Sequence, residues 1–164
     1  MAGKSFSFIL SAVMLIIIGG WLIIAGLLPI IGIDLGYYST TVVAVSVYIM
    51  LETGIYAYFM WYIYPLVGAL AFVTGLMLFK GKGKGLGIIL YLITLVLAVL
   101  GVLFMFKLAG YTSGDEIWEF FKNALNSGDI LAAIGILLEP ILIILGSALG
   151  LLLLIAGKAD KASK

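Results

Sequence analysis

The fold of this chain is decided by its first apolar stretch, residues 6–31, which reads FSFILSAVMLIIIGGWLIIAGLLPII. No charged side chain interrupts the stretch, and as a straight helix it would be about 39 Å long. The hydrocarbon core of a bilayer is about 30 Å thick, so this helix could cross it with some tilt. The stretch therefore predicts a transmembrane helix, and the polar turn formed by Gly32, Asp34 and Gly36 is expected to follow it.

The composition of the whole chain agrees with a membrane protein. Of its 164 residues, 65% are hydrophobic and only 10% are charged, whereas soluble domains are about a quarter charged. Cysteine and histidine are absent, which excludes disulfides, thiolate nucleophiles and metal sites built from these residues. We therefore expect an all-α integral membrane protein with no cofactor, no metal and no enzyme activity. The lysines form no basic patch of the kind that binds nucleic acid, so no nucleic-acid partner is expected.

Three further apolar stretches predict three more spans, over about residues 56–79, 86–106 and 130–157. The start of the second span needs an argument, because the chain is apolar from Tyr38 to Phe79 except for Glu52. One helix over this length would be about 60 Å long, twice the hydrocarbon thickness. A cluster of aromatic residues divides it and is typical of interfacial anchors: Tyr56, Tyr58, Trp61, Tyr62 and Tyr64. Residues 32–55 are then an outer segment.

Residues 107–129 form a second outer segment, and they contain an amphipathic pattern. Ser113 and Glu116 have the spacing of a capping box, so a helix is expected from Ser113 to Asn126. Trp118 is a further interfacial anchor on this helix. A short helix with one apolar and one charged face is expected to lie in the membrane interface. The predicted fold is therefore a single domain, residues 1–164, made of a four-transmembrane-helix bundle with two helical hairpins and outer interfacial helices.

The lysines predict the orientation. Lys4, the loop at residues 80–85 and the tail at residues 158–164 fall on one side of a four-span protein, whereas Lys107 and Lys122 fall on the other. Because lysine-rich segments stay on the cytoplasmic side, both termini are expected in the cytoplasm of a cell-membrane protein.

Two features bear on other arrangements of the spans. In a five-span protein, Ser39–Leu51 would cross alone, but it is too short and would separate the lysine clusters. The two halves of the chain also resemble each other weakly, since Gly36-Tyr37-Tyr38-Ser39 is similar to Gly110-Tyr111-Thr112-Ser113. A real internal repeat would be of the parallel kind found in some transporters.

Glu139, followed by Pro140, is the strongest candidate for a functional residue, because a carboxylate within a span suggests an ion or proton site. It precedes Lys158 by 19 residues, or about 28 Å of helix, which places it near the outer edge of the hydrocarbon. A partly hydrated carboxylate is therefore favoured over an ion site, with Lys107 or a tyrosine as its possible partner. Glu52 is a second candidate and lies farther out.

Small residues on two spans have the spacing that lets transmembrane helices approach closely. They are Gly68, Ala71 and Gly75 on the second span and Gly146 and Gly150 on the fourth. This pattern predicts close helix packing, either within the chain or between subunits.

The sequence favours a non-catalytic membrane subunit, an accessory or scaffold component of a larger assembly. Its expected partners are the lipid bilayer and other membrane subunits or further copies of itself. Polar groups within the spans are too few to line an aqueous path: Ser7, Ser11, Thr74, Thr94, Glu139 and Ser147. The alternative is a small proton- or cation-coupled transporter or channel that uses Glu139. A structural protein of an envelope or vesicle would have the same sequence features.

Overall fold

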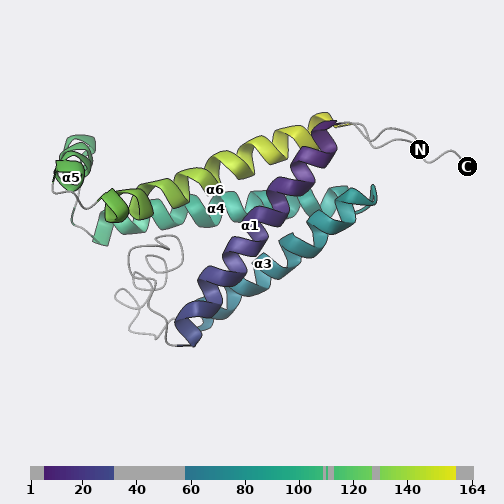
Figure 1. Ribbon diagram of the computed structural model, residues 1–164, viewed down its shortest axis with the longest axis horizontal. Coiled ribbons are helices and arrows are strands. Elements are labelled where there is room, and N and C mark those ends of the chain that lie inside the picture. Colours follow the sequence, from purple (N-terminus) through teal and green to yellow (C-terminus); the bar gives the residue numbers. More distant parts are fainter. Residues whose placement is uncertain (1–5, 32–57, 109, 111–112, 127–129, 158–164) are drawn as a thin grey trace, which may run out of the picture.

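The computed structural model describes residues 6–31, 58–108, 110, 113–126 and 130–157, and the regular structure of this part is entirely helical (Figure 1). Four helices are long and apolar enough to cross a membrane, which agrees with the number of spans expected from the sequence. They are α1 (Phe6–Ile30), α3 (Tyr58–Phe79), α4 (Lys84–Leu108) and α6 (Ile130–Ala156). The shorter α5 (Gly114–Asn126) precedes α6. The outer segment at residues 32–55, which contains Glu52, lies outside the described residues, as does Tyr56 at the expected start of the second span.

The four long helices pack as two antiparallel pairs, α1 with α3 and α4 with α6 (Figure 1). In the first pair the backbones come very close, because Gly19 of α1 faces Gly68 and Phe72 of α3. Small residues allow this approach, which gives dispersion contacts between helices that lipid cannot replace. Pro65 of α3 also packs against Gly26 of α1, where no side chain is in the way.

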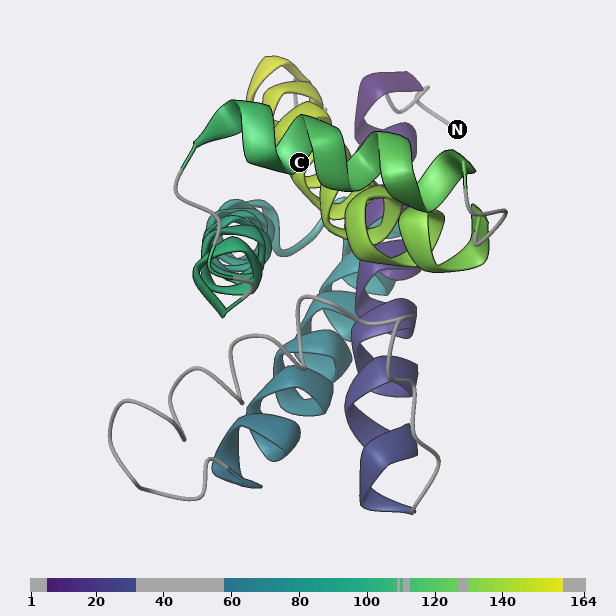
Figure 2. The ribbon, with the colours of Figure 1, turned by 90° about the vertical axis from the view of Figure 1, so that its left-hand side faces the viewer.

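The two pairs are joined mainly by contacts between α1 and α6. They meet at one end of the molecule and diverge toward the other (Figures 1 and 2). We call the end where they meet the lysine end, because it carries Lys80, Lys82 and Lys84 together with the start of α1 and the end of α6. We call the opposite end, with the start of α3 and the start of α6, the far end.

Gly81 ends α3 at the lysine end. Its φ is +74°, which only glycine adopts without strain. The Gly81 N–H donates to the carbonyl of Leu78 and the Lys82 N–H donates to that of Met77, which is the Schellman arrangement of a helix C-terminus. The turn to α4 is therefore short and hydrogen-bonded.

The turn is shorter than the loop expected over residues 80–85, because Lys84 already belongs to α4. The Lys84 ammonium donates to the carbonyl of Gly157 at 2.8 Å and lies 3.4 Å from that of Ile155. Ile155 is in the last turn of α6 and Gly157 directly follows the helix, and a cation is favourable beside carbonyls at a helix C-terminus. Lys84 therefore joins the start of α4 to the end of α6.

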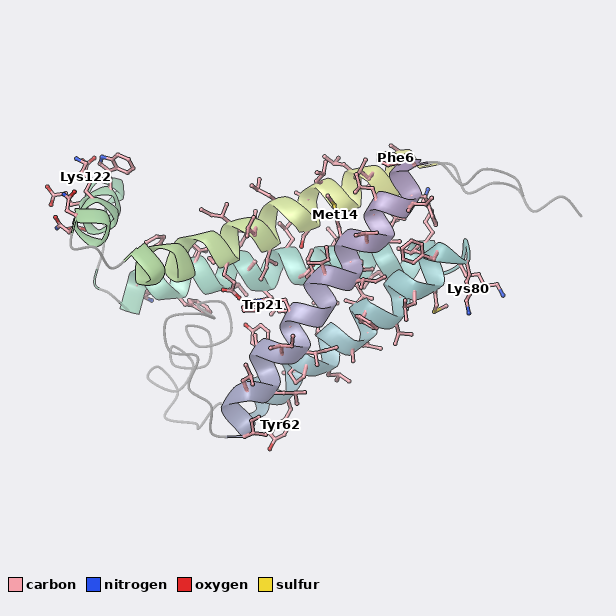
Figure 3. The ribbon with its side chains drawn as sticks, viewed as in Figure 1. Phe6, Met14, Trp21, Tyr62, Lys80 and Lys122 are labelled. Atoms are coloured by element: carbon pink, nitrogen blue, oxygen red, sulfur yellow. The ribbon has the colours of Figure 1, made fainter. Side chains whose placement is uncertain are left out.

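Helix α5 begins with the predicted capping box, which the structure confirms. The Ser113 N–H donates to the Glu116 carboxylate at 3.0 Å, and the Glu116 N–H lies 3.4 Å from the Ser113 hydroxyl. The helix crosses the far ends of α4 and α6, as Figure 2 shows. Lys122 is on the side of α5 that points away from the other helices (Figure 3). This arrangement suits a helix that lies along a membrane surface.

Candidate functional site

The most informative polar contact joins Trp21 of α1 to Glu139 of α6. The Trp21 indole N–H donates to the Glu139 carboxylate, with 2.8 Å between Nε1 and Oε1, and the contact is partly buried. Trp21 lies in the angle between the two helix pairs (Figure 3). An indole can only donate a hydrogen bond and a carboxylate can only accept one when ionised, so the two groups match.

Tyr64 of α3 belongs to the same cluster. Its side chain is 0% exposed, and its phenol interacts electrostatically with the Glu139 carboxylate. The cluster of Trp21, Tyr64 and Glu139, which we call the Glu139 cluster, therefore combines side chains from three helices and from both helix pairs. Neither Tyr64 nor Glu139 is limited to these contacts, since each has a further interaction.

The Glu139 cluster lies in the half of the molecule away from the lysine end. Trp21 is 15 residues after Phe6 and Glu139 is 17 residues before Ala156, which corresponds to about 22 Å and about 26 Å of helix. Glu139 also stands one residue before Pro140, which cannot donate a backbone hydrogen bond inside α6. Among the described side chains of the bundle interior, Glu139 is the one carboxylate, and a charge at this depth is costly unless donors compensate it.

A second polar cluster lies nearer the lysine end and is fully buried. Ser11 of α1 donates to the carbonyl of Gly150 on α6 at 2.9 Å and lies 3.2 Å from the hydroxyl of Tyr91 on α4. The Tyr91 hydroxyl in turn donates to the backbone carbonyl of Ser11. Thr94 and Ser147 are 2.9 Å apart and connect α4 with α6. These neutral groups bond to one another across three helices and hold them together.

The small residues that were predicted to allow close helix packing contact different helices in the structure. Gly68 and Gly75 of α3 face α1, where Gly75 lies against Ala12 and Ile16, and Ala71 is fully buried. Gly150 of α6 accommodates the Tyr91 ring, and Gly146 lies beside Ile18 of α1. Each of these contacts is made within the chain.

The aromatic residues expected at the interface differ in how exposed their side chains are. Tyr62 is 62% exposed, whereas Tyr64, two residues later, is buried in the Glu139 cluster and does not face lipid or water. Tyr58 and Trp61 belong to the first turn of α3, but their side chains lie outside the described part. Trp118 is 56% exposed on α5, with the Lys122 ammonium 5.5 Å from the centre of its ring.

Sequence reasoning missed Trp21 and Tyr91, although a signal existed for Trp21. Tryptophan in membrane proteins gathers at the interfaces, and Trp21 stands well inside its span, where its N–H needs an acceptor. The acceptor sits 118 residues later, and nothing in the sequence connects the two. Tyr91 carries no such signal, because its hydrogen-bond partner Ser11 and the glycine that makes room for its ring, Gly150, lie on other helices.

The groups of the Glu139 cluster are suited to hydrogen bonding. Trp21 offers an N–H, Tyr64 an O–H, and Glu139 a carboxylate. Within the described residues, no group of three or more His, Cys, Asp and Glu side chains could hold a metal ion.

Comparison with protein-family models, curated proteins and solved structures finds no match to this chain.

Proposed function

We propose that the chain is a non-catalytic integral membrane subunit, which acts as an accessory or scaffold component of a larger membrane assembly. The observation that carries this proposal is that the chain's own side chains fill the interior and satisfy its hydrogen bonds. Glycines bring α1 and α3 into backbone contact, and Tyr91 fills the space above Gly150. In the described part of the chain, every buried side-chain nitrogen or oxygen has a hydrogen-bond partner. Such an interior stabilises the helices and leaves the outer surface for interactions.

The outer surface supports the same proposal. Large apolar side chains are exposed on all four long helices, for example Ile17, Leu66, Leu103 and Leu145. Lipid covers such faces, and so do helices of other subunits, since lipid tails and leucine side chains are equally apolar. Partners in the membrane are therefore expected to be other subunits or further copies of this chain.

Site-specific photo-crosslinking in native membranes tests the proposal. A photoreactive phenylalanine analogue replaces Leu103, Leu145 or Leu152, which are 57 to 63% exposed, and replaces the fully buried Leu154 as the control. We expect one helix face to give a crosslinked product of defined mass, and Leu154 to give none. Isolation of an uncrosslinked monomer from every position, with nothing co-purifying in mild detergent, would contradict the proposal.

A second candidate function is a small proton- or cation-coupled transporter or channel, and the contact between Trp21 and Glu139 favours it. Carboxylates inside spans are often the coupling groups of transporters, and this one sits between both helix pairs. In proteoliposomes with an imposed proton gradient, Glu139→Gln is then expected to abolish ion flux, whereas Tyr62→Phe on the exposed face of α3 should preserve it. Equal flux in the wild type and in Glu139→Gln would exclude this candidate.

A further inference from the structure

The Glu139 cluster occupies the point where the two helix pairs separate. Of the described side-chain hydrogen bonds between the pairs, those of Ser11 are near the lysine end, and the bond from Trp21 to Glu139 is the one farthest from it. Beyond it the pairs diverge toward the far end (Figure 1). A change in this bond therefore acts next to the part of the molecule where the pairs diverge (Figure 1).

We propose that Glu139 is a proton-binding site, and that proton binding there loosens the contact between α1 and α6 at Trp21. This proposal does not depend on whether the chain is a subunit of a larger assembly. It identifies the ligand of the Glu139 site as a proton. A neutral donor such as an indole N–H binds an ionised carboxylate more strongly than a protonated one, because the charge assists the bond. Uptake of a proton by the Glu139 carboxylate removes that assistance.

The donors around Glu139 favour a proton over a metal ion. A calcium ion takes six to eight oxygen ligands and a magnesium ion takes six. In the described part of the Glu139 cluster, the side-chain oxygens belong to Glu139 and Tyr64, and the Trp21 N–H points its positive end at the carboxylate. A proton needs a single carboxylate oxygen, so the same surroundings suit it.

Other titratable groups near the cluster are few in the described part. Tyr64 of α3 interacts electrostatically with Glu139. The pairing of Thr94 with Ser147 sets the antiparallel register of α4 and α6, and it places Lys107 of α4 about a turn and a half farther toward the far end than Glu139. Lys107 is exposed there. From α1, the group that meets Glu139 is Trp21, which does not titrate.

Proton binding at Glu139 is measured by NMR spectroscopy, through the indole N–H signals of the tryptophan side chains. The chain has three tryptophans, so protein labelled with ¹⁵N-tryptophan in detergent micelles gives three indole N–H signals, and Trp21→Phe identifies that of Trp21. Between about pH 4 and pH 9, a range that brackets the usual carboxyl pKa, the Trp21 signal is expected to shift. It should not shift in Glu139→Gln, and the exposed Trp118 provides a reference in the same spectrum. Sodium, magnesium or calcium added at constant pH should leave the Trp21 signal in place.

The loosening of the helix contact is measured as a distance. Because the chain has no cysteine, spin labels go only to introduced cysteines, at Leu27 of α1 and Leu103 of α4, both exposed in the diverging half. We expect longer distances at low pH in the wild type, and long distances at every pH in Glu139→Gln and Trp21→Phe. A second label pair at Ile9 and Leu152, nearer the lysine end, should keep one distance throughout. A Trp21 signal that stays fixed, or distances that do not change with pH, would overturn the proposal.

Discussion

At Gly68 the first helix pair has no room for a side chain. A Cβ at this position would lie 2.7 Å from the Gly19 carbonyl oxygen and 2.8 Å from the Ile23 backbone nitrogen, both on α1. These neighbours are backbone atoms, so a rotamer change cannot relieve the overlap. The helices would have to move apart along the whole contact between α1 and α3.

Gly68→Ala is therefore expected to destabilise the protein by about 1 to 3 kcal/mol, the usual effect of overpacking a tight core. Thermal unfolding in detergent, followed by the loss of monodisperse protein, measures the change. The matched control is Gly85→Ala on α4, where an added Cβ would meet nothing within 4 Å, so its stability should stay within about 0.5 kcal/mol of the wild type. Equal stability of both variants would show that α1 and α3 do not pack as described.

A residue could be recognised from the sequence when its own type and position are unusual. The residues that it contacts could not be identified in the same way. Glu139 stands out in the sequence because charges are rare within spans. Lys107 or a tyrosine was expected beside it, and Tyr64 does interact with Glu139. The donor at 2.8 Å, Trp21 of another helix, was not expected. Tyr64 resembles Tyr62 in sequence, yet the rotation of α3 against α1 and α6 buries one ring and exposes the other.

Among the described elements, α5 contacts mainly α6. The stability of α5 is therefore expected to depend on the hydrogen bonds at its own N-terminus. Two of its otherwise unpaired groups are satisfied by the reciprocal bonds of Ser113 and Glu116. Ser113→Ala removes one of them and is expected to cost about 1 kcal/mol of helix stability. Hydrogen exchange of the α5 amides should then be about five-fold faster.

The exchange rates of α4 and α6 serve as internal references, and Ser113→Thr should retain most of the protection because threonine also caps helices. Unchanged α5 exchange in Ser113→Ala would mean that tertiary or lipid contacts, and not the capping box, hold the helix.

Helix positions followed closely from apolar length. α1 and α6 each end one residue before the predicted limit, and α3 begins at Tyr58, two residues after it. α4 also differs by two residues at each end, since it was expected over residues 86–106 and runs from Lys84 to Leu108. A lysine is counted as a loop residue when only hydropathy is considered, and its bond to Gly157 depends on the end of another helix.

At the scale of the whole molecule, the described lysines lie at opposite ends. Lys80 marks one end and Lys122 the other in Figure 3. Both side chains are exposed, as is that of Lys82. If the protein spans a membrane with its lysine end in the cytoplasm, an amine reagent that cannot cross the membrane will react with Lys122 and not with Lys80 or Lys82.

We therefore expect that, of Lys80, Lys82 and Lys122, only Lys122 is labelled when intact cells are treated with such a reagent, as read by peptide mass spectrometry. Cells opened by mild detergent before treatment should be labelled at all three lysines, which controls for reactivity. Label on Lys82 in intact cells would contradict the proposed orientation.

How the helices pair could not be read from the sequence with the same certainty as their number. Hydropathy gives the length of each span, but all four have apolar side chains on every side, so no single stripe selects a partner. The selection rests on local shapes, such as Gly19 against Gly68 and Tyr91 against Gly150, which differ between the two pairs. The crossing of α1 with α6 depends on both sets of contacts.

The bond from Lys84 to the last carbonyls of α6 has a consequence for biosynthesis. The ribosome makes α3 before it reaches Lys84, so α1 and α3 can associate while the rest of the chain is still being translated. The carbonyls of Ile155 and Gly157 emerge more than 70 residues after Lys84. Until then the ammonium of Lys84 cannot form this bond, so α4 and α6 can be joined at the lysine end only after α6 has been synthesised.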